Sequence, residues 1–309
     1  MDKKTIMLFS IFLIGILLVA CEGGNTDVNV QQSPYIGGTK GITATFEPFG
    51  VYNEQTKIYE IFEGEAFPIE LTVKNKGEQK IESGMLSVNL TGISLAEFSG
   101  IVAGGSISNN ESVDEVSDTN KDGGQITLDL TPGTEDAKYL TNLSGGTKDL
   151  EIYARVSYRY KTRVSVPTVC FKGDPNNKEI CTIEETKAAY SSGAPIQAVS
   201  AEEKSIGTGK FMVEIAIENE GSGEVTKPGT GFSTRYDELT FSVSEPSIWE
   251  CKSGGKLNEA RLDSDSKATI QCRTKNAVSK DDLYTKELRL DMDYDYRELI
   301  HQQLRLKKQ

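Results

Sequence analysis

Residues 118–129 carry the strongest metal-ligand pattern in this chain. Asp118, Asn120 and Asp122 alternate with other residues, Gly123 follows, and Asp129 stands at the twelfth position. Alternating side-chain oxygens before a glycine turn wrap calcium in EF-hand loops. The alternative is a solvated acidic loop that ends in an Asp-Gly turn, because flanking helical patterns are not evident. Calcium is therefore the only cofactor for which the sequence offers a candidate site.

Residues with catalytic chemistry are scarce. The chain has one histidine, His301, so a Ser-His-Asp relay would depend on that residue alone. The sequence has no Gly-x-Ser-x-Gly, His-Glu-x-x-His or phosphate-binding glycine loop. Asp291, Asp293 and Asp295 alternate with apolar residues, which predicts the wet face of one strand. We expect a non-catalytic protein, and a carboxylate-dependent hydrolase is the less favoured alternative.

Four cysteines form two local pairs along the chain. Cys170 and Cys181 flank one turn-rich segment, and Cys251 and Cys272 flank another. An even number of cysteines is typical of exported proteins, in which disulfides persist. Four cysteines permit three connectivities, and we favour the two local pairs. A four-thiolate zinc site is disfavoured, because structural zinc sites use much closer spacing within each cysteine pair.

The N-terminal residues have the order of a secretory signal. Lys3 and Lys4 precede an apolar run over residues 6–20, which ends in Leu-Val-Ala before Cys21. This ending resembles the lipobox of prokaryotic lipoproteins, which implies cleavage before Cys21 and lipidation of its thiol. Two acyl chains would hold the protein stably at a membrane. The alternatives are an uncleaved signal-anchor, although the run is short for a membrane span, and free secretion.

The composition fits an exported protein with an acidic surface. The chain has 309 residues and a formal net charge of -12 at pH 7. An acidic surface without a basic stripe repels phosphates, so nucleic-acid binding is not expected. The sequence after Cys21 has no apolar stretch long enough to cross a bilayer. We therefore expect the body of the protein at the outer face of the cell membrane.

Three acceptor triplets for N-glycosylation begin at Asn89, Asn110 and Asn142. They become meaningful only for an exported protein in a host that glycosylates. Asn110 lies in a polar stretch and is expected to be exposed, whereas Asn89 lies within a strand pattern. Asn110 is therefore the first candidate for a glycan.

The chain contains an internal duplication. Residues 67–81 align without gaps on residues 211–225, and residues 147–159 align on residues 285–297. The offsets are 144 and 138 residues, so the two matches keep their order and nearly their spacing. A period this long indicates two tandem domains rather than a solenoid of short repeats.

The repeated segments alternate between apolar and polar residues. Phe67, Ile69, Leu71 and Val73 would share one face of a strand, and this period of two is typical of antiparallel sheets with one buried face. Further candidate strands cover residues 42–46, 85–90, 125–130, 238–243 and 268–272. Short strands with frequent turns predict an all-β protein built from β-sandwiches.

Each copy places an Asn-x-Gly motif after its first strand, from Asn75 to Gly77 and from Asn219 to Gly221. We interpret the motif as a turn, because asparagine and glycine tolerate positive φ. These units resemble the CARDB-type immunoglobulin-like domains of prokaryotic surface proteins. With the lipobox-like ending, they make the chain similar to archaeal cell-surface lipoproteins. The resemblance implies two tandem immunoglobulin-like sandwiches and a surface location, and it supplies no catalytic residues.

The expected organisation has five parts: a signal helix over residues 1–20, a lipidated cysteine and flexible tether over 21–41, a first sandwich over 42–181, a linker over 182–199 and a second sandwich over 200–309. The expected function is adhesion, spacing or protein–protein contact by a lipid-anchored surface protein. The alternative is a lipoprotein that binds a sugar, a peptide or calcium for an envelope complex or transporter. The membrane and a protein partner are the expected contacts, and the oligomeric state stays open.

Overall fold

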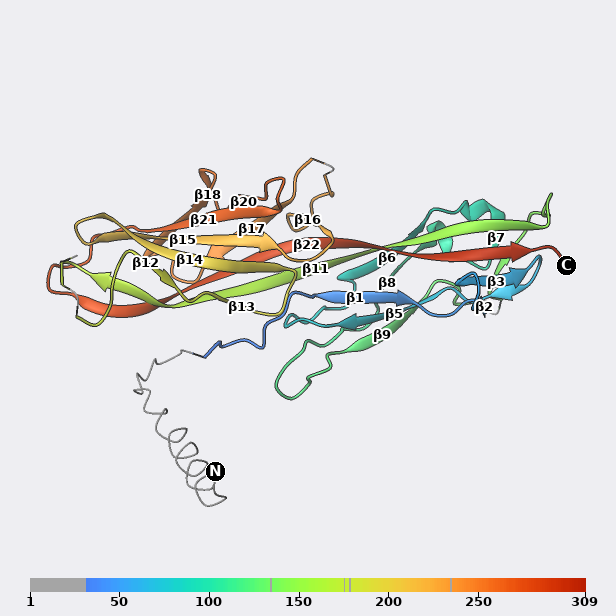
Figure 1. Cartoon of the computed structure of the whole chain (residues 1–309), viewed down its shortest axis with the longest axis horizontal. Coiled ribbons are helices and arrows are strands. Elements are labelled where there is room, and N and C mark those ends of the chain that lie inside the picture. Colours follow the sequence, from blue (N-terminus) through green and yellow to red (C-terminus); the bar gives the residue numbers. More distant parts are fainter. Residues whose placement is uncertain (1–31, 134, 175, 178, 234) are drawn as a thin grey trace, which may run out of the picture. The chain divides into compact units, whose positions relative to one another are not determined.

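The computed structural model describes residues 32–133, 135–174, 176–177, 179–233 and 235–309. Within these ranges the regular structure is β-strand, apart from two short 3₁₀ helices (Figure 1), so the all-β expectation is confirmed. The signal segment and Cys21 lie outside the described residues. Ser33–Gln309 forms one compact unit. The described part of the chain has no helix long and apolar enough to span a membrane.

The strands are numbered in chain order. They are β1 (Ile42–Phe46), β2 (Val51–Asn53), β3 (Ile58–Phe62), β4 (Ala66–Phe67), β5 (Glu70–Asn75), β6 (Leu86–Thr91), β7 (Phe98–Ser99), β8 (Ser106–Ser108), β9 (Gln125–Asp129), β10 (Ala137–Tyr139), β11 (Thr147–Lys172), β12 (Glu185–Lys187), β13 (Tyr190–Ser191), β14 (Ile196–Gly207), β15 (Lys210–Asn219), β16 (Glu224–Thr226), β17 (Glu238–Val243), β18 (Trp249–Ser253), β19 (Lys256–Leu257), β20 (Glu259–Arg261), β21 (Lys267–Thr274) and β22 (Leu283–Lys307). The 3₁₀ helices are η1 (Leu95–Glu97) and η2 (Ala103–Gly105).

Four sheets contain these strands. Two sheets are three-stranded, with the orders β1-β5-β9 and β4-β10-β7, and a third is six-stranded, with the order β12-β14-β15-β21-β18-β19. The fourth has ten strands along a main path β2-β3-β22-β11-β6-β8, to which β13, β16, β17 and β20 are attached. Among the described pairings only β3 with the end of β22 is parallel, so the sheets are antiparallel almost throughout, as the alternation predicts.

A long two-stranded ribbon joins the two copies of the repeat (Figure 1). β11 from the first copy and β22 from the second pair from Thr147 opposite Lys307 to Lys172 opposite Leu283. At about 3.3 Å per residue the ribbon is about 80 Å long. β6 of the first copy extends it on the β11 side, whereas β16 and β17 of the second copy extend it on the β22 side. The two copies therefore share one sheet.

The segment expected to link the two domains is part of the folded unit. Residues 182–199 include β12, β13 and the start of β14, and Ala194 and Ile196 within them are fully buried. The boundaries at 42–181 and 200–309 stay predictions, because the shared ribbon runs through both.

The apolar face of the ribbon supplies much of the core. Leu150, Ile152, Ala154 and Val156 alternate with polar residues along β11 and are buried. They belong to one hydrophobic cluster that also contains the apolar positions of β5 and β15. Each buried leucine, isoleucine or valine stabilises the fold by about 1.5–3 kcal/mol relative to exposure. Sheets whose apolar faces meet in this way give a sandwich-like fold.

Four tyrosines meet at the middle of the ribbon. Tyr158 lies opposite Tyr296, and Tyr160 lies opposite Tyr294, with ring centroids 5.6 and 6.4 Å apart. Burial raises the pKa of Tyr158 and of Tyr294 well above the ordinary value, which keeps both hydroxyls protonated. Buried hydroxyls need hydrogen-bond partners. The Tyr158 hydroxyl accepts the backbone N–H of Ile42, and the Tyr294 hydroxyl bonds the Thr162 hydroxyl at 2.8 Å, whereas Tyr160 and Tyr296 find theirs in the repeated motifs.

The tyrosine hydroxyls bind the two Asn-x-Gly motifs in the same way. The Tyr160 hydroxyl donates to Asn75 Oδ1 at 3.2 Å, and the Tyr296 hydroxyl donates to Asn219 Oδ1 at 3.1 Å. Each hydroxyl also accepts from the backbone N–H four residues after its asparagine, at 3.3 and 2.8 Å. These bonds equate Tyr160 with Tyr296, an offset of 136 residues, which is two fewer than the sequence match suggests.

The explanation of the repeated glycine by positive φ is wrong. Neither Gly77 nor Gly221 is among the described residues with positive φ. A Cβ on Gly77 would lie 2.2 Å from the Tyr160 hydroxyl oxygen, and one on Gly221 would lie 2.1 Å from that of Tyr296. The motif therefore requires glycine because a tyrosine hydroxyl approaches the backbone too closely for any side chain.

Candidate functional site

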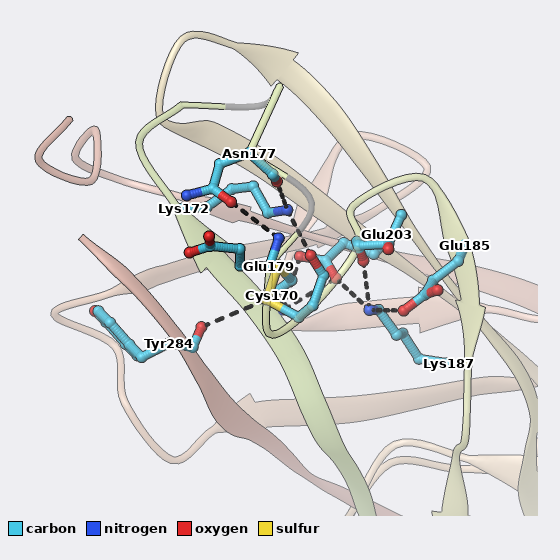
Figure 2. Close-up of a disulfide and its surroundings, with 10 residues drawn as sticks. Cys170, Lys172, Asn177, Glu179, Glu185, Lys187, Glu203 and Tyr284 are labelled. Atoms are coloured by element: carbon cyan, nitrogen blue, oxygen red, sulfur yellow. Dashed lines mark hydrogen bonds and ion pairs between the residues drawn. A yellow bond between two sulfur atoms is a disulfide. The ribbon is translucent and has the colours of Figure 1, made fainter. Parts of the chain in front are cut away.

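A buried pair of opposite charges lies beside the disulfide of Cys170 and Cys181 (Figure 2). The Glu203 carboxylate, on β14, accepts the backbone N–H of Cys170 at 3.1 and 3.0 Å. Its other neighbour is the ammonium of Lys187, on β12, whose Nζ lies 3.1 Å from Glu203 Oε2. The side chains of Glu203 and Lys187 are buried. Removing either partner of a buried ion pair destabilises the fold strongly, because the remaining charge is left buried without compensation.

Burial raises the pKa of Glu203 to about 7, although the Cys170 N–H and the Lys187 ammonium both act to lower it. The carboxyl therefore changes protonation near neutral pH. Both of its oxygens face protein donors, so it holds strands together and does not stand open as a general base. The Glu203 carboxyl therefore joins β11, β12 and β14, and the strength of these contacts depends on its protonation.

Two buried lysines fasten the loop that the disulfide closes. Lys172 Nζ donates to the backbone carbonyls of Asn177 and Cys181, and Lys187 Nζ donates to that of Thr182 at 2.7 Å. Lys187 also contacts the Glu185 carboxylate. Charged donors form the stronger class of hydrogen bond, so these contacts fix the loop against the end of β11.

Both local disulfides are present. Cys170 bonds Cys181 with their Cα atoms 5.7 Å apart, and Cys251 bonds Cys272 with a Cα separation of 4.0 Å. Cys251 and Cys272 lie directly opposite each other on β18 and β21. All four thiols are used, which removes the zinc alternative. Disulfides persist in oxidising compartments, so the pair indicates an oxidising, extracellular environment.

Trp249 belongs to the core of the second copy. It is buried at the start of β18, and its ring packs edge-on against Phe171 and Phe211 at 5.6 and 5.8 Å. Its Nε1 lacks a hydrogen-bond partner among the described residues. The residue therefore serves packing and does not present a ring to a ligand.

The first described residues are bound at the middle of the ribbon. The Glu78 carboxylate accepts the backbone N–H groups of Ile36 at 3.1 Å, Gly37 at 2.8 Å and Gly193 at 2.6 Å. Glu78 directly follows the first Asn-x-Gly motif, next to the central tyrosines. It joins the N-terminal segment to the segment between β13 and β14.

The three glycosylation triplets differ in accessibility. Asn110 and Asn142 are exposed in loops, as expected for Asn110. Asn89 is half-buried in β6, between Arg155 of β11 and Ser106 of β8 in the sheet. Glycosylation stays a prediction for these residues, with Asn110 and Asn142 the more accessible.

The candidate calcium ligands have separate roles in the structure. Asp118 is exposed, Asn120 donates to a nearby backbone carbonyl at 3.1 Å, and Asp122 lies 3.9 Å from a lysine ammonium. Asp129 ends β9 and accepts two hydrogen bonds from Thr131, at 2.7 and 3.1 Å. The described residues contain no group of three or more His, Cys, Asp or Glu side chains placed to hold a metal. The calcium site stays a hypothesis.

The remaining charged candidates lie on the outer face of the ribbon. His301 is exposed and stacks on the Tyr153 ring at 5.5 Å. Asp291, Asp293 and Asp295 each pair with a cation of β11 at 2.9–3.5 Å. This is the cross-strand pairing expected of a solvated face.

Sequence reasoning missed Glu203, Lys187 and Glu78. Glu203 lies in the charged run Glu202-Glu203-Lys204, which suggests an exposed segment. The period of two was the available signal, because Glu203 shares its face with the small residue Ala201, which is buried. Glu78 has no such signal, since its three partners are distant backbone groups.

Comparisons with known proteins assign no family. No protein-family model matches the chain, and no curated protein matches it. Among solved structures, the secreted serine protease VesC from Vibrio cholerae matches with 9% identity and a TM-score of 0.19, over 84% of this chain and 50% of that one. The chain thus spans half the length of VesC. A triple jelly-roll protein of an archaeal virus matches with 8% identity and a TM-score of 0.13, over 90% of this chain and 100% of that one. These scores are too low to support a shared fold.

Proposed function

We propose that the protein is an exported, lipid-anchored surface protein that contacts a partner close to the membrane and performs no catalysis. The lipobox-like Leu-Val-Ala-Cys21 ending supports the anchor, and the two disulfides support export. The sandwich-like fold and the repeat support two tandem immunoglobulin-like domains that exchange strands through the ribbon.

The observation that carries this proposal is the attachment of residues 36–37 to Glu78 at the middle of the ribbon. Eleven residues separate Cys21 from Ser33. Even fully extended they reach at most about 40 Å, roughly half the length of the ribbon. An anchor at Cys21 therefore holds the middle of the ribbon within about 40 Å of the membrane, so we infer that the partner is contacted close to the membrane.

The β1-β5-β9 sheet offers one kind of contact surface. It ends in β1 and β9, and neither outer edge pairs with another described strand. Open strand edges pair with strands of partner proteins. These open edges favour adhesion or protein–protein contact as the role of the protein.

Replacing the lipidated thiol tests the anchor. Cys21→Ser should abolish lipid labelling and move the folded protein from the membrane fraction to the medium, because export does not need the thiol whereas acylation does. Wild-type protein and a second variant, Cys21→Ala, provide the comparison. Retention of both variants in membranes would contradict lipid anchoring and favour a signal-anchor.

A further inference from the structure

The second copy of the repeat carries a longer loop than the first. Between β15 and β17 the second copy has residues 220–237, which include the short strand β16, whereas between β5 and β6 the first copy has residues 76–85. The longer loop carries Arg235 and Tyr236. Loops that extend a rigid scaffold commonly hold its binding residues.

This loop borders a groove of about 770 Å³ on the second copy. The opposite side of the groove comes from residues around β19 and β20, including Lys256 and Arg261. This volume lies in the usual range for small-ligand sites, about 300–1,000 Å³.

The cations of the groove have spare binding capacity. The Arg261 guanidinium stacks on the Tyr236 ring, with its Cζ 3.3 Å from the ring centroid, and both residues are exposed. Stacking occupies the flat face of a guanidinium and leaves its N–H edges available. Within the described residues, the Arg235 and Arg261 guanidinium groups donate no hydrogen bond and form no ion pair. Lys256 comes no closer than 3.9 Å to a carboxylate.

The carboxylates of the groove are already engaged. Glu224 pairs with Arg297, and Asp263 accepts two backbone N–H groups at 2.9 and 3.0 Å. Asp237 accepts the Val225 N–H at 3.0 Å, and burial raises its pKa. The arginines therefore hold the spare donors of the groove, and the second oxygens of Asp237 and Asp263, which accept no hydrogen bond from a described residue, are its spare acceptors.

We propose that this groove binds an acidic saccharide, with one sugar carboxylate held by the Arg261 fork. Planar guanidinium and carboxylate groups match in a bidentate pair. Ser233, Ser253 and Ser264 also line the groove and can bind sugar hydroxyls. The same acids that would repel a polyacidic peptide can accept hydrogen bonds from those hydroxyls. A sugar acid fits this mixture of donors and acceptors better than an acidic peptide does.

Calorimetric titration of the detergent-solubilised protein at low salt tests the proposal. The probes are trigalacturonate, the neutral galactotriose and hexaglutamate. Trigalacturonate should bind, and the other two should bind at least about tenfold more weakly. Arg261→Gln should weaken trigalacturonate binding at least about tenfold, and Arg261→Lys should weaken it less, because lysine keeps the charge but lacks the fork. Arg155→Gln, an exposed arginine outside the groove, is the matched control and should leave binding unchanged.

Several outcomes would overturn the proposal. They are no binding of trigalacturonate, equal binding of galactotriose or hexaglutamate, or full binding by Arg261→Gln. Unchanged melting temperatures of the variants would show that any loss is local. The titration does not depend on the lipid, so its failure leaves the proposed anchor intact, and loss of the anchor leaves this site intact.

Discussion

At the scale of single residues, Glu203 links the stability of the fold to pH. Its pKa is about 7 in the folded protein, because burial disfavours the carboxylate, against an ordinary value of 4.5. Between these values the folded state binds more protons than the unfolded state. The stability that Glu203 contributes is therefore fully present below about pH 4.5 and is lost as the pH rises through 7.

We predict that the free energy of unfolding falls by up to about 3 kcal/mol from pH 5 to pH 8. Denaturant titrations across this range measure the slope. Glu203→Gln should reduce it, because glutamine cannot ionise, while Asp237 and Glu298, whose pKa values burial also raises, keep a smaller slope of the same sign. Glu202→Gln on the exposed face should keep the wild-type slope. A wild-type protein whose stability rises or stays level over this range would refute the assigned role of Glu203.

Residue patterns in the sequence predict some of these sites and not others. The two disulfides follow from local spacing, because each pair closes a short turn-rich segment. Glu203 and Glu78 act through partners far away in the chain, so their neighbours in sequence carry no sign of the contact. Burial of a charge depends on tertiary pairing that local composition does not encode.

At the scale of elements, the Asn-x-Gly motifs and the tyrosines of the ribbon form two matching joints. At Gly221 a Cβ would meet chiefly the Tyr296 ring and hydroxyl, with Pro195 Cβ at 3.0 Å. At Gly77 a Cβ would also meet the carbonyl oxygens of Gly193 and Lys40, at 2.4 and 2.7 Å. The two joints should therefore respond differently to the same substitution.

Gly221→Ala should destabilise the protein by about 1–3 kcal/mol, as overpacking does. Adding Tyr296→Phe should recover part of that loss, because it removes the clashing oxygen. A double-mutant cycle from denaturant titrations measures this coupling. Tyr160→Phe should not recover the stability lost in Gly77→Ala, because the two carbonyl oxygens still clash with the new methyl group. Gly145→Ala is the control, because the space around Gly145 is open. Equal coupling energies at both joints would contradict the packing described.

The positions of the strands follow well from the alternation of apolar and polar residues. Which residue of one copy corresponds to which residue of the other does not. The repeated segments are strands with the expected buried faces. The second sequence match is two residues away from the equivalence that the tyrosine hydrogen bonds show. Alternation cannot reveal this error, because a shift of two keeps every side chain on the same face. Tyrosines spaced by two on both strands make the wrong and right alignments look alike.

At the scale of the whole molecule, the ribbon couples both copies of the repeat. β11 and β22 pair along their full length, and the end of β22 pairs with β3 of the first copy. Sequence patterns cannot reveal this sharing, because a strand's alternation is the same whether its partner lies in its own repeat or in the other. The pairing depends on contacts more than a hundred residues apart.

Shared strands predict a single cooperative unfolding transition for residues 33–309. Unfolding of either copy would remove the strand that pairs with β11 or β22 of the other copy, so neither copy should stay folded alone. Differential scanning calorimetry of the protein should give a van't Hoff enthalpy equal to the calorimetric enthalpy. Two resolved transitions would support independent domains with the boundaries that the sequence suggests.

A membrane anchor at Cys21 should hold the ribbon by its middle. Energy transfer from single fluorophores to a bilayer dye tests it, with non-cysteine labels at Lys76 near the middle and at Ser279 and Lys308 near the two ends. We predict the strongest transfer from Lys76 and weaker transfer from both ends, all of it lost in Cys21→Ser. Strongest transfer from either end, with Lys76 intermediate, would contradict attachment by the middle and indicate a spacer that stands on one end.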